Sequence, residues 1–120
     1  SAIGTTDELS DEAQIDLMTA LPGSGAAYPA LMAVAMADFM RARGVDTAIA
    51  WRAAEAALCG GTRMLAQDIT RAPALLDAYR DYRGTTAAGL EAAEAAGFSA
   101  ALDAALIAAT AAARRLGETD

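Results

Sequence analysis

The residues best suited to binding a ligand are four consecutive ones, Arg83-Gly84-Thr85-Thr86. A glycine turn followed by hydroxyl side chains at the start of a helix presents backbone N–H groups and the positive end of the helix dipole. Such a helix start can hold an anion, for example the carboxylate of a small molecule. A simpler interpretation also stands: Thr85 or Thr86 caps the helix that follows and binds nothing.

A second glycine-rich segment is Gly23-Ser24-Gly25. Its two glycines superficially suggest a dinucleotide-binding loop, but no strand pattern precedes them and no third glycine follows at the required spacing. Two interpretations remain. The segment is a tight entry into the next helix, or it allows the backbone to come close to a ligand or a neighbouring domain.

Other chemistry has little support in the sequence. The chain has no histidine and one cysteine, Cys59, which removes the commonest general base and metal ligand and excludes an internal disulfide. Cys59 lies in an apolar stretch and is predicted to be a small buried hydrophobic residue, and Tyr79 and Tyr82 are predicted to pack rather than donate protons. The acidic residues show no metal-ligand spacing. We therefore predict neither a catalytic residue nor a metal site.

The composition predicts an all-α fold. The chain is 55% hydrophobic but only 5% aromatic, and alanine dominates, which favours closely packed helices over a sheet of β-branched residues. Its 120 residues suit one domain, and the net charge of −7 has the wrong sign for nucleic-acid binding. The most apolar stretch, residues 26–40, is too short to span a membrane. The single cysteine fits a cytoplasmic location.

Caps and helix breakers divide the chain into about six helices. Ser10, Asp46 and Ser99 are expected N-caps, and Gly44 and Gly97 are expected to end helices. We expect that the helix from Asp46 accommodates Gly60-Gly61 either by bending or, as we favour, because another backbone passes close to it. The expected helices cover approximately residues 10–20, 25–43, 46–67, 73–81, 85–97 and 100–116.

The second of these helices is apolar on almost every side. Leu31, Val34, Met36 and Phe39 point in different directions around it, and 120 residues offer few neighbours to cover them all. We infer that a second chain supplies part of the cover, as in an obligate dimer.

Two segments together resemble a known family. The run from Thr19 to Tyr28, T-A-L-P-G-S-G-A-A-Y, and the run from Arg83 to Leu90, R-G-T-T-A-A-G-L, are similar to the T-A-L-S-G-S-G-P-A-Y and S-P-G-G-T-T-x-x-G-L segments of pyrroline-5-carboxylate reductase. Glu91 to Phe98 also resembles that family's L-E-x-x-G-F-R ending. The resemblance extends over nearly the whole chain and indicates the family's C-terminal domain.

The resemblance implies a helical bundle that intertwines with its twin in a homodimer, with a ring of five dimers as a further assembly. It also implies an oxidoreductase of proline biosynthesis, in which an N-terminal Rossmann domain binds NADPH or NADH and hydride passes to the cyclic imine of pyrroline-5-carboxylate. We expect residues 1–120 to be one dimerisation and substrate domain. The Rossmann domain is then absent from this chain, which would bind no cofactor and be inactive alone.

The resemblance further implies which residues bind substrate. Thr86 with Thr85 and Gly84 would hold the substrate carboxylate from the partner chain, and Gly23-Ser24-Gly25 would border the nicotinamide. The family's S-P-G-G is replaced here by Asp81-Tyr82-Arg83-Gly84, so Asp81 and Arg83 would line the anion site. A like-charge contact at about 4 Å costs about 4 kcal/mol at an effective dielectric near 20, which suggests a different substrate unless an arginine offsets it.

Two other function classes remain open. The first is a diverged, non-catalytic dimerisation or ligand-binding module, which would lack an upstream β-α-β unit with G-x-G-x-x-G. The second is an unrelated helical ligand-binding protein, which a monomeric state in solution would favour.

Overall fold

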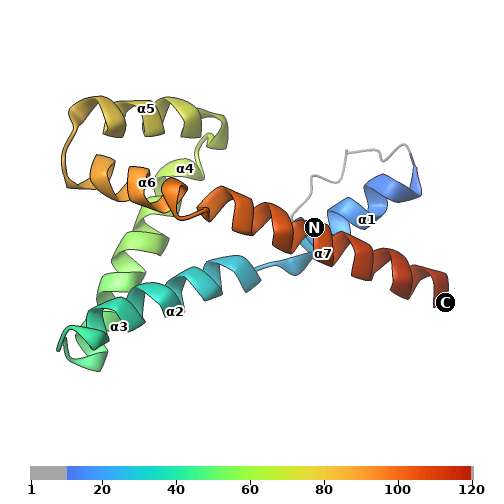
Figure 1. Cartoon of the computed structure of the whole chain (residues 1–120), viewed down its shortest axis with the longest axis horizontal. Helices are drawn as coiled ribbons and strands as arrows, with labels where there is room; N and C mark the ends of the chain where they lie inside the picture. The colour runs from blue at the N-terminus through green and yellow to red at the C-terminus, as the bar shows by residue number, and fades with distance from the viewer. Residues whose placement is uncertain (1–10, 120) are drawn as a thin grey trace. The chain divides into compact units, whose positions relative to one another are not determined.

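The computed structural model describes residues 11–119, and in this range every regular element is helical (Figure 1). The prediction of an all-α fold is confirmed. The α-helices are α1 (Glu12–Ala20), α2 (Ala27–Ala42), α3 (Thr47–Glu55), α4 (Gly61–Leu65), α5 (Ala72–Tyr82), α6 (Thr85–Ala95) and α7 (Phe98–Thr119). Because α3, a π-helical turn and α4 follow one another without a break, the helical segments match the six expected from the sequence.

The described residues belong to two compact units, each considered by itself. The first comprises the residues up to Gly25 together with those from Gly89 onward, and it holds α1 and α7. The second is Ala26–Ala88 and holds α2 to α5.

In the second unit α2 packs against α3. Figure 1 shows the two helices, and alanine side chains form their contact. Ala37, Ala50 and Ala54 are buried at this contact, and Met36 and Met40 pack against them half-buried. Because alanine projects only one methyl group, the two helix backbones come close together. The contact therefore orients α2 and α3 without burying a large side chain.

In the first unit α1 packs against α7, although nearly the full length of the chain separates them in sequence. Only Ala20 is buried among the described residues of this unit. The contact leaves a groove open along the two helices, which is described below.

Local signals set most helix ends. The Asp46 carboxylate accepts a hydrogen bond from the Ala48 N–H at 3.1 Å, as expected for the N-cap of α3. Asp11 caps α1 in the same way, accepting from the Gln14 N–H at 3.0 Å, whereas the predicted cap Ser10 lies outside the described residues. Gly44 and Gly97 both have positive φ, which fits their predicted role in ending helices.

The Gly60-Gly61 pair differs from our expectation. No backbone of the described chain comes within 4 Å of a Cβ built on either glycine, so the close approach that we favoured is not found. Instead the helix widens into a π-helical turn at Ala56–Gly60 before α4 begins. Cys59 lies in this turn and is exposed, so the prediction that it is buried was wrong.

Two other helix ends differ from the predictions. Helix α7 begins at Phe98 and runs to Thr119, so the predicted cap Ser99 lies inside its first turn and the helix extends beyond the predicted end at residue 116. The Ser99 hydroxyl donates instead to Glu94 Oε1 in α6, at 2.7 Å. Thr85 is the first residue of α6 and Thr86 the second, so neither threonine precedes the helix as a cap.

The segment Glu12–Ala42 has the length and mean hydropathy, 1.2, of a membrane span. Its backbone does not form one helix, however. A 3-10 turn at Pro22–Ser24 separates the 9 residues of α1 from the 16 of α2, and Gly25 has φ 58°. Each helix is shorter than the roughly 20 residues that cross a bilayer.

Candidate functional site: an uncovered apolar surface and a helix junction

Residues 11–119 leave many large apolar side chains exposed. The buried residues of the described chain are all alanines: Ala20, Ala37, Ala50 and Ala54. A buried leucine or phenylalanine contributes about 1.5–3 kcal/mol to stability, and no described residue of that size is buried. A stable fold therefore requires further cover for these helices.

Helix α2 carries the clearest part of this surface. Leu31 is 69% exposed, Phe39 is 54% exposed, and Val34 on the same helix is also exposed. Ile49 and Trp51 on α3 add further exposed apolar area within the same unit. Several large exposed apolar side chains on one helix pair are typical of an interaction surface in soluble proteins.

The predicted anion-binding residues lie together at the junction between α5 and α6. Helix α5 ends at Tyr82, and Arg83 takes the left-handed conformation with φ 58° while its N–H donates to the Arg80 carbonyl. Gly84 follows, and its carbonyl accepts from the Ala88 N–H at 3.3 Å in the first turn of α6. Arg83, Gly84 and the two threonines are thus consecutive on one sharp turn.

The side chains at this junction are available to a ligand. Asp81, Arg83, Thr85 and Thr86 are exposed, and no hydrogen bond to either threonine hydroxyl comes from residues 11–119. The first N–H groups of an α-helix have no intrahelical acceptor, so those of α6 point outward with the positive end of the helix dipole. An anion is the ligand that this geometry favours.

Neighbouring arginines do not neutralise Asp81 in this structure. Arg80 pairs with Asp77 at 3.8 Å, and within the described chain neither Arg80 nor Arg83 forms an ion pair with Asp81. The arginines therefore do not neutralise the negative charge of Asp81 in this structure, although we had considered that they could.

Each residue of Gly23-Ser24-Gly25 helps to form the turn between α1 and α2. A Cβ on Gly23 would lie 3.2 Å from the Met18 carbonyl oxygen, and Gly25 needs its positive φ. The Ser24 hydroxyl donates to the Ala20 carbonyl at 2.7 Å. These contacts explain the segment as a tight turn, in agreement with the first of our two interpretations. Its proximity to a cofactor stays a prediction.

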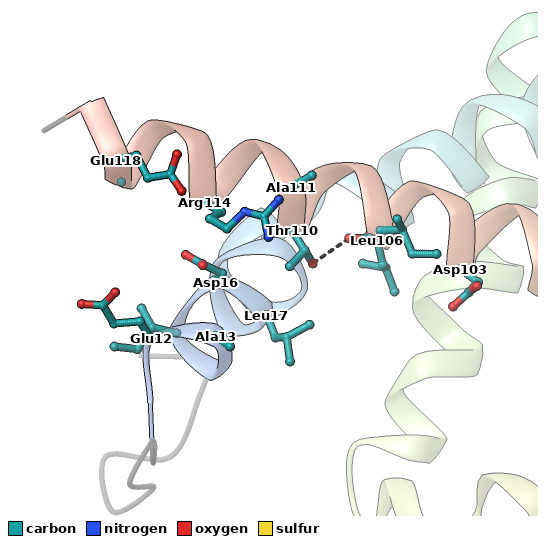
Figure 2. Close-up of a pocket in the computed structure, with 13 residues that line it drawn as sticks. Glu12, Ala13, Asp16, Leu17, Asp103, Leu106, Thr110, Ala111, Arg114 and Glu118 are labelled. Carbon is teal, nitrogen blue, oxygen red and sulfur yellow. Dashed lines mark hydrogen bonds between the residues drawn. The ribbon is translucent and has the colours of Figure 1, made fainter.

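A groove lies between α1 and α7 (Figure 2), and no sequence pattern predicted it. Its volume is about 1190 Å³, and its polar side chains are mostly carboxylates, among them Glu12, Asp16 and Asp103. Nothing in the sequence pairs α1 with α7, because the contact depends on tertiary packing. The acidic residues of α1 were the only feature of the sequence that could have indicated an acidic surface here.

Comparison with known proteins identifies the family. A family model described as pyrroline-5-carboxylate reductase dimerisation matches residues 12–116. Pyrroline-5-carboxylate reductase of Pseudomonas aeruginosa is 35% identical over 118 residues, covering 98% of this chain and 43% of the relative. Pyrroline-5-carboxylate reductase 3 of Mus musculus is 35% identical over 107 residues, covering 89% of this chain and 39% of the relative.

A third relative agrees with these two. Pyrroline-5-carboxylate reductase of Synechocystis sp. is 33% identical over 118 residues, covering 98% of this chain and 44% of the relative. The chain thus spans less than half the length of these relatives. The resemblance found in the two sequence motifs is confirmed, and the chain belongs to the pyrroline-5-carboxylate reductase dimerisation family.

Proposed function

We propose that this chain is the dimerisation and substrate-binding part of an NAD(P)H-dependent reductase that converts pyrroline-5-carboxylate to L-proline. The observation that carries the dimerisation role is the absence of a large buried side chain in the described residues, together with the exposed apolar face of α2. A second copy covers this face in a homodimer, and such dimers can assemble further.

Substrate binding is assigned to the start of α6. The substrate is a cyclic imine with a carboxylate, and the first N–H groups of α6 with the hydroxyls of Thr85 and Thr86 suit that carboxylate. Hydrogen bonds from several fixed donors orient the imine ring and leave the C=N carbon open to a hydride donor. Gly84 itself adds no side chain beside these donors.

The dinucleotide is assigned to another part of the full-length protein. A dinucleotide-binding fold needs parallel strands and a glycine-rich turn between a strand and a helix, whereas residues 11–119 contain no strand. Gly23-Ser24-Gly25 connects two helices and has a different geometry. The described residues therefore do not fit the dinucleotide, and we assign them no step of hydride transfer.

The alternative, a diverged module, has one observation in its favour. Asp81 is exposed beside the predicted carboxylate site and is not paired with Arg80 or Arg83. A carboxylate there disfavours an anionic substrate, so the protein would bind a different ligand at this site or none.

The test is a steady-state assay of the full-length protein with NADPH and pyrroline-5-carboxylate. If Thr86 binds the carboxylate, Thr86→Val lowers kcat/KM by about 10- to 100-fold, because a hydrogen bond to a charged group is worth about 1.5–3 kcal/mol. The control is Thr62→Val, since the Thr62 hydroxyl donates to the Cys59 carbonyl away from this junction. Equal effects of the two substitutions would contradict the assignment.

Asp81→Ser separates the two candidate functions. If the reductase tolerates Asp81, the wild-type protein turns over pyrroline-5-carboxylate and the variant binds proline with similar affinity. If the module has diverged, the wild-type protein is inactive and Asp81→Ser restores proline binding.

A further inference from the structure

The ring of Tyr82 lies beside the start of α6, to which the substrate carboxylate is assigned. Gly84 is the residue just before this helix, and its carbonyl accepts from the Ala88 N–H. A side chain at such a position can reach the N–H groups of the second and third helical residues. A Cβ built on Gly84 lies 3.1 Å from Cδ2 and Cε2 of Tyr82. The ring is therefore next to the amides that would hold an anion, and all these residues belong to one compact unit, Ala26–Ala88.

Most of this ring is open to a ligand. Tyr82 is 85% exposed and is the last residue of α5. In the part of the chain that the structure describes, a guanidinium lies over an aromatic ring where Arg43 is 3.7 Å from the centroid of Phe39, and not at Tyr82. Arg83, the next residue along the chain, therefore leaves the faces of the Tyr82 ring uncovered.

The ring face suits a positive charge on the substrate. In pyrroline-5-carboxylate and in L-proline the ring nitrogen is bonded to the carbon that carries the carboxylate. A group beside the carboxylate site is therefore also close to this nitrogen, which is positively charged in L-proline and in the protonated imine. The face of an aromatic ring attracts such a cation within about 6 Å of the ring centroid.

The charged neighbours of Tyr82 do not by themselves select a cation. Asp81 precedes it and Arg83 follows it, both exposed, so their effects on a bound cation have opposite signs. Arg80 is paired with Asp77 at 3.8 Å, so these two add no net charge. The aromatic face is the feature of the junction that favours a positively charged ring nitrogen.

We propose that Tyr82 determines specificity at this site, favouring ring carboxylates with a positively charged ring nitrogen over uncharged rings of the same shape. This inference rests on the proposed function and adds the residue that recognises the charge of the substrate ring. The S-P-G-G motif that resembles this segment has proline where this chain has Tyr82, so the contact is one that this chain adds.

Two ligands that differ in one ring atom test the proposal. L-proline has a charged ring nitrogen at neutral pH, and tetrahydrofuran-2-carboxylate has an uncharged oxygen in its place. Isothermal titration calorimetry of the full-length protein with saturating NADP⁺ measures the Kd of each. In Tyr82→Leu the Kd of L-proline should rise about 3- to 10-fold, as for a cation on a partly exposed ring, and that of the analogue less than about 2-fold.

Two further variants show whether the ring itself is responsible. Tyr82→Phe keeps the ring and loses the hydroxyl, so it should keep the preference for L-proline. Tyr79→Leu removes another aromatic ring of α5, which is 41% exposed and outside the junction, and it should leave both Kd values unchanged. Circular dichroism checks that every variant remains helical.

The outcomes separate this inference from the proposed function. A loss for the analogue in Tyr82→Leu as large as that for L-proline, or no loss for either ligand, overturns the role of Tyr82 alone. Thr86→Val should weaken both ligands alike, because both carry the carboxylate. If the wild-type protein binds neither ligand, or if Thr86→Val leaves both Kd values unchanged, the assigned carboxylate site is wrong and the inference about Tyr82 is wrong with it.

Discussion

The ring of Tyr82 lies directly over Gly84, so that a Cβ added to Gly84 would be 3.1 Å from the Cδ2 and Cε2 atoms of the ring. This contact joins the last residue of α5 to the residue just before α6. It shows why glycine suits this position and how a mutation can disturb the helix start that we assign to substrate binding.

Gly84→Ala should lower the free energy of unfolding by about 1 kcal/mol, since alanine is a poor residue before a helix and its methyl group displaces the ring. Chemical denaturation at one fixed chain concentration measures this change. In a Tyr82→Ala background the cost should fall, because the ring is then absent. An undiminished cost in that background would show that the ring contact is irrelevant.

Arg83 is the only described residue other than glycine with a positive φ, 58°. Replacing it with glycine removes the steric cost of the left-handed conformation, so Arg83→Gly should raise the free energy of unfolding by up to about 1 kcal/mol. The matched control is Arg80→Gly inside α5, which should lower it by about 1 kcal/mol. In thermal and urea unfolding, stability should therefore rise for Arg83→Gly and fall for Arg80→Gly. Changes of the same sign would contradict the conformational explanation.

The alanine contact between α2 and α3 should not tolerate larger residues. Ala50 is fully buried, so Ala50→Leu forces the two helices apart and should cost about 1–3 kcal/mol. Ala48→Leu on the same helix is the control, because Ala48 is exposed, and it should cost well under 1 kcal/mol. The measurement is again urea denaturation, and equal costs would show that this contact does not define the core.

A charge on the exposed face of α2 should dissociate the proposed dimer. Leu31→Asp places a carboxylate where a second copy would bury a leucine, so the dissociation constant should rise at least 100-fold in sedimentation velocity. Gln67→Asp is the control, because it adds the same charge at an exposed polar position, and it should leave association unchanged. Circular dichroism checks that both variants remain helical. A stable Leu31→Asp dimer would place the interface elsewhere.

Local signals in the sequence were enough to predict the helical class, several helix ends and the family. Those features depend on signals that act over a few residues: the Asp46 carboxylate caps its own helix, and Gly44 and Gly97 adopt positive φ where a side chain would be strained. The two motifs around Gly23-Ser24-Gly25 and Gly84-Thr85-Thr86 could be recognised from the order and spacing of their residues alone. The residues of the α5–α6 junction were singled out in this way, and their role in substrate binding stays a prediction.

Which residues are buried and which surfaces remain open depends on how whole helices pack. Alanine occurs on every side of these helices, so the hydrophobic pattern could not distinguish Ala37 and Ala50, which are buried, from Ala48, which is exposed. The groove between α1 and α7 requires contact between distant parts of the chain. The Gly60-Gly61 pair marked an irregularity in its helix, but it did not indicate a π-helical turn at Ala56–Gly60. Burial depends on where whole helices pack, and no short segment of sequence contains that information.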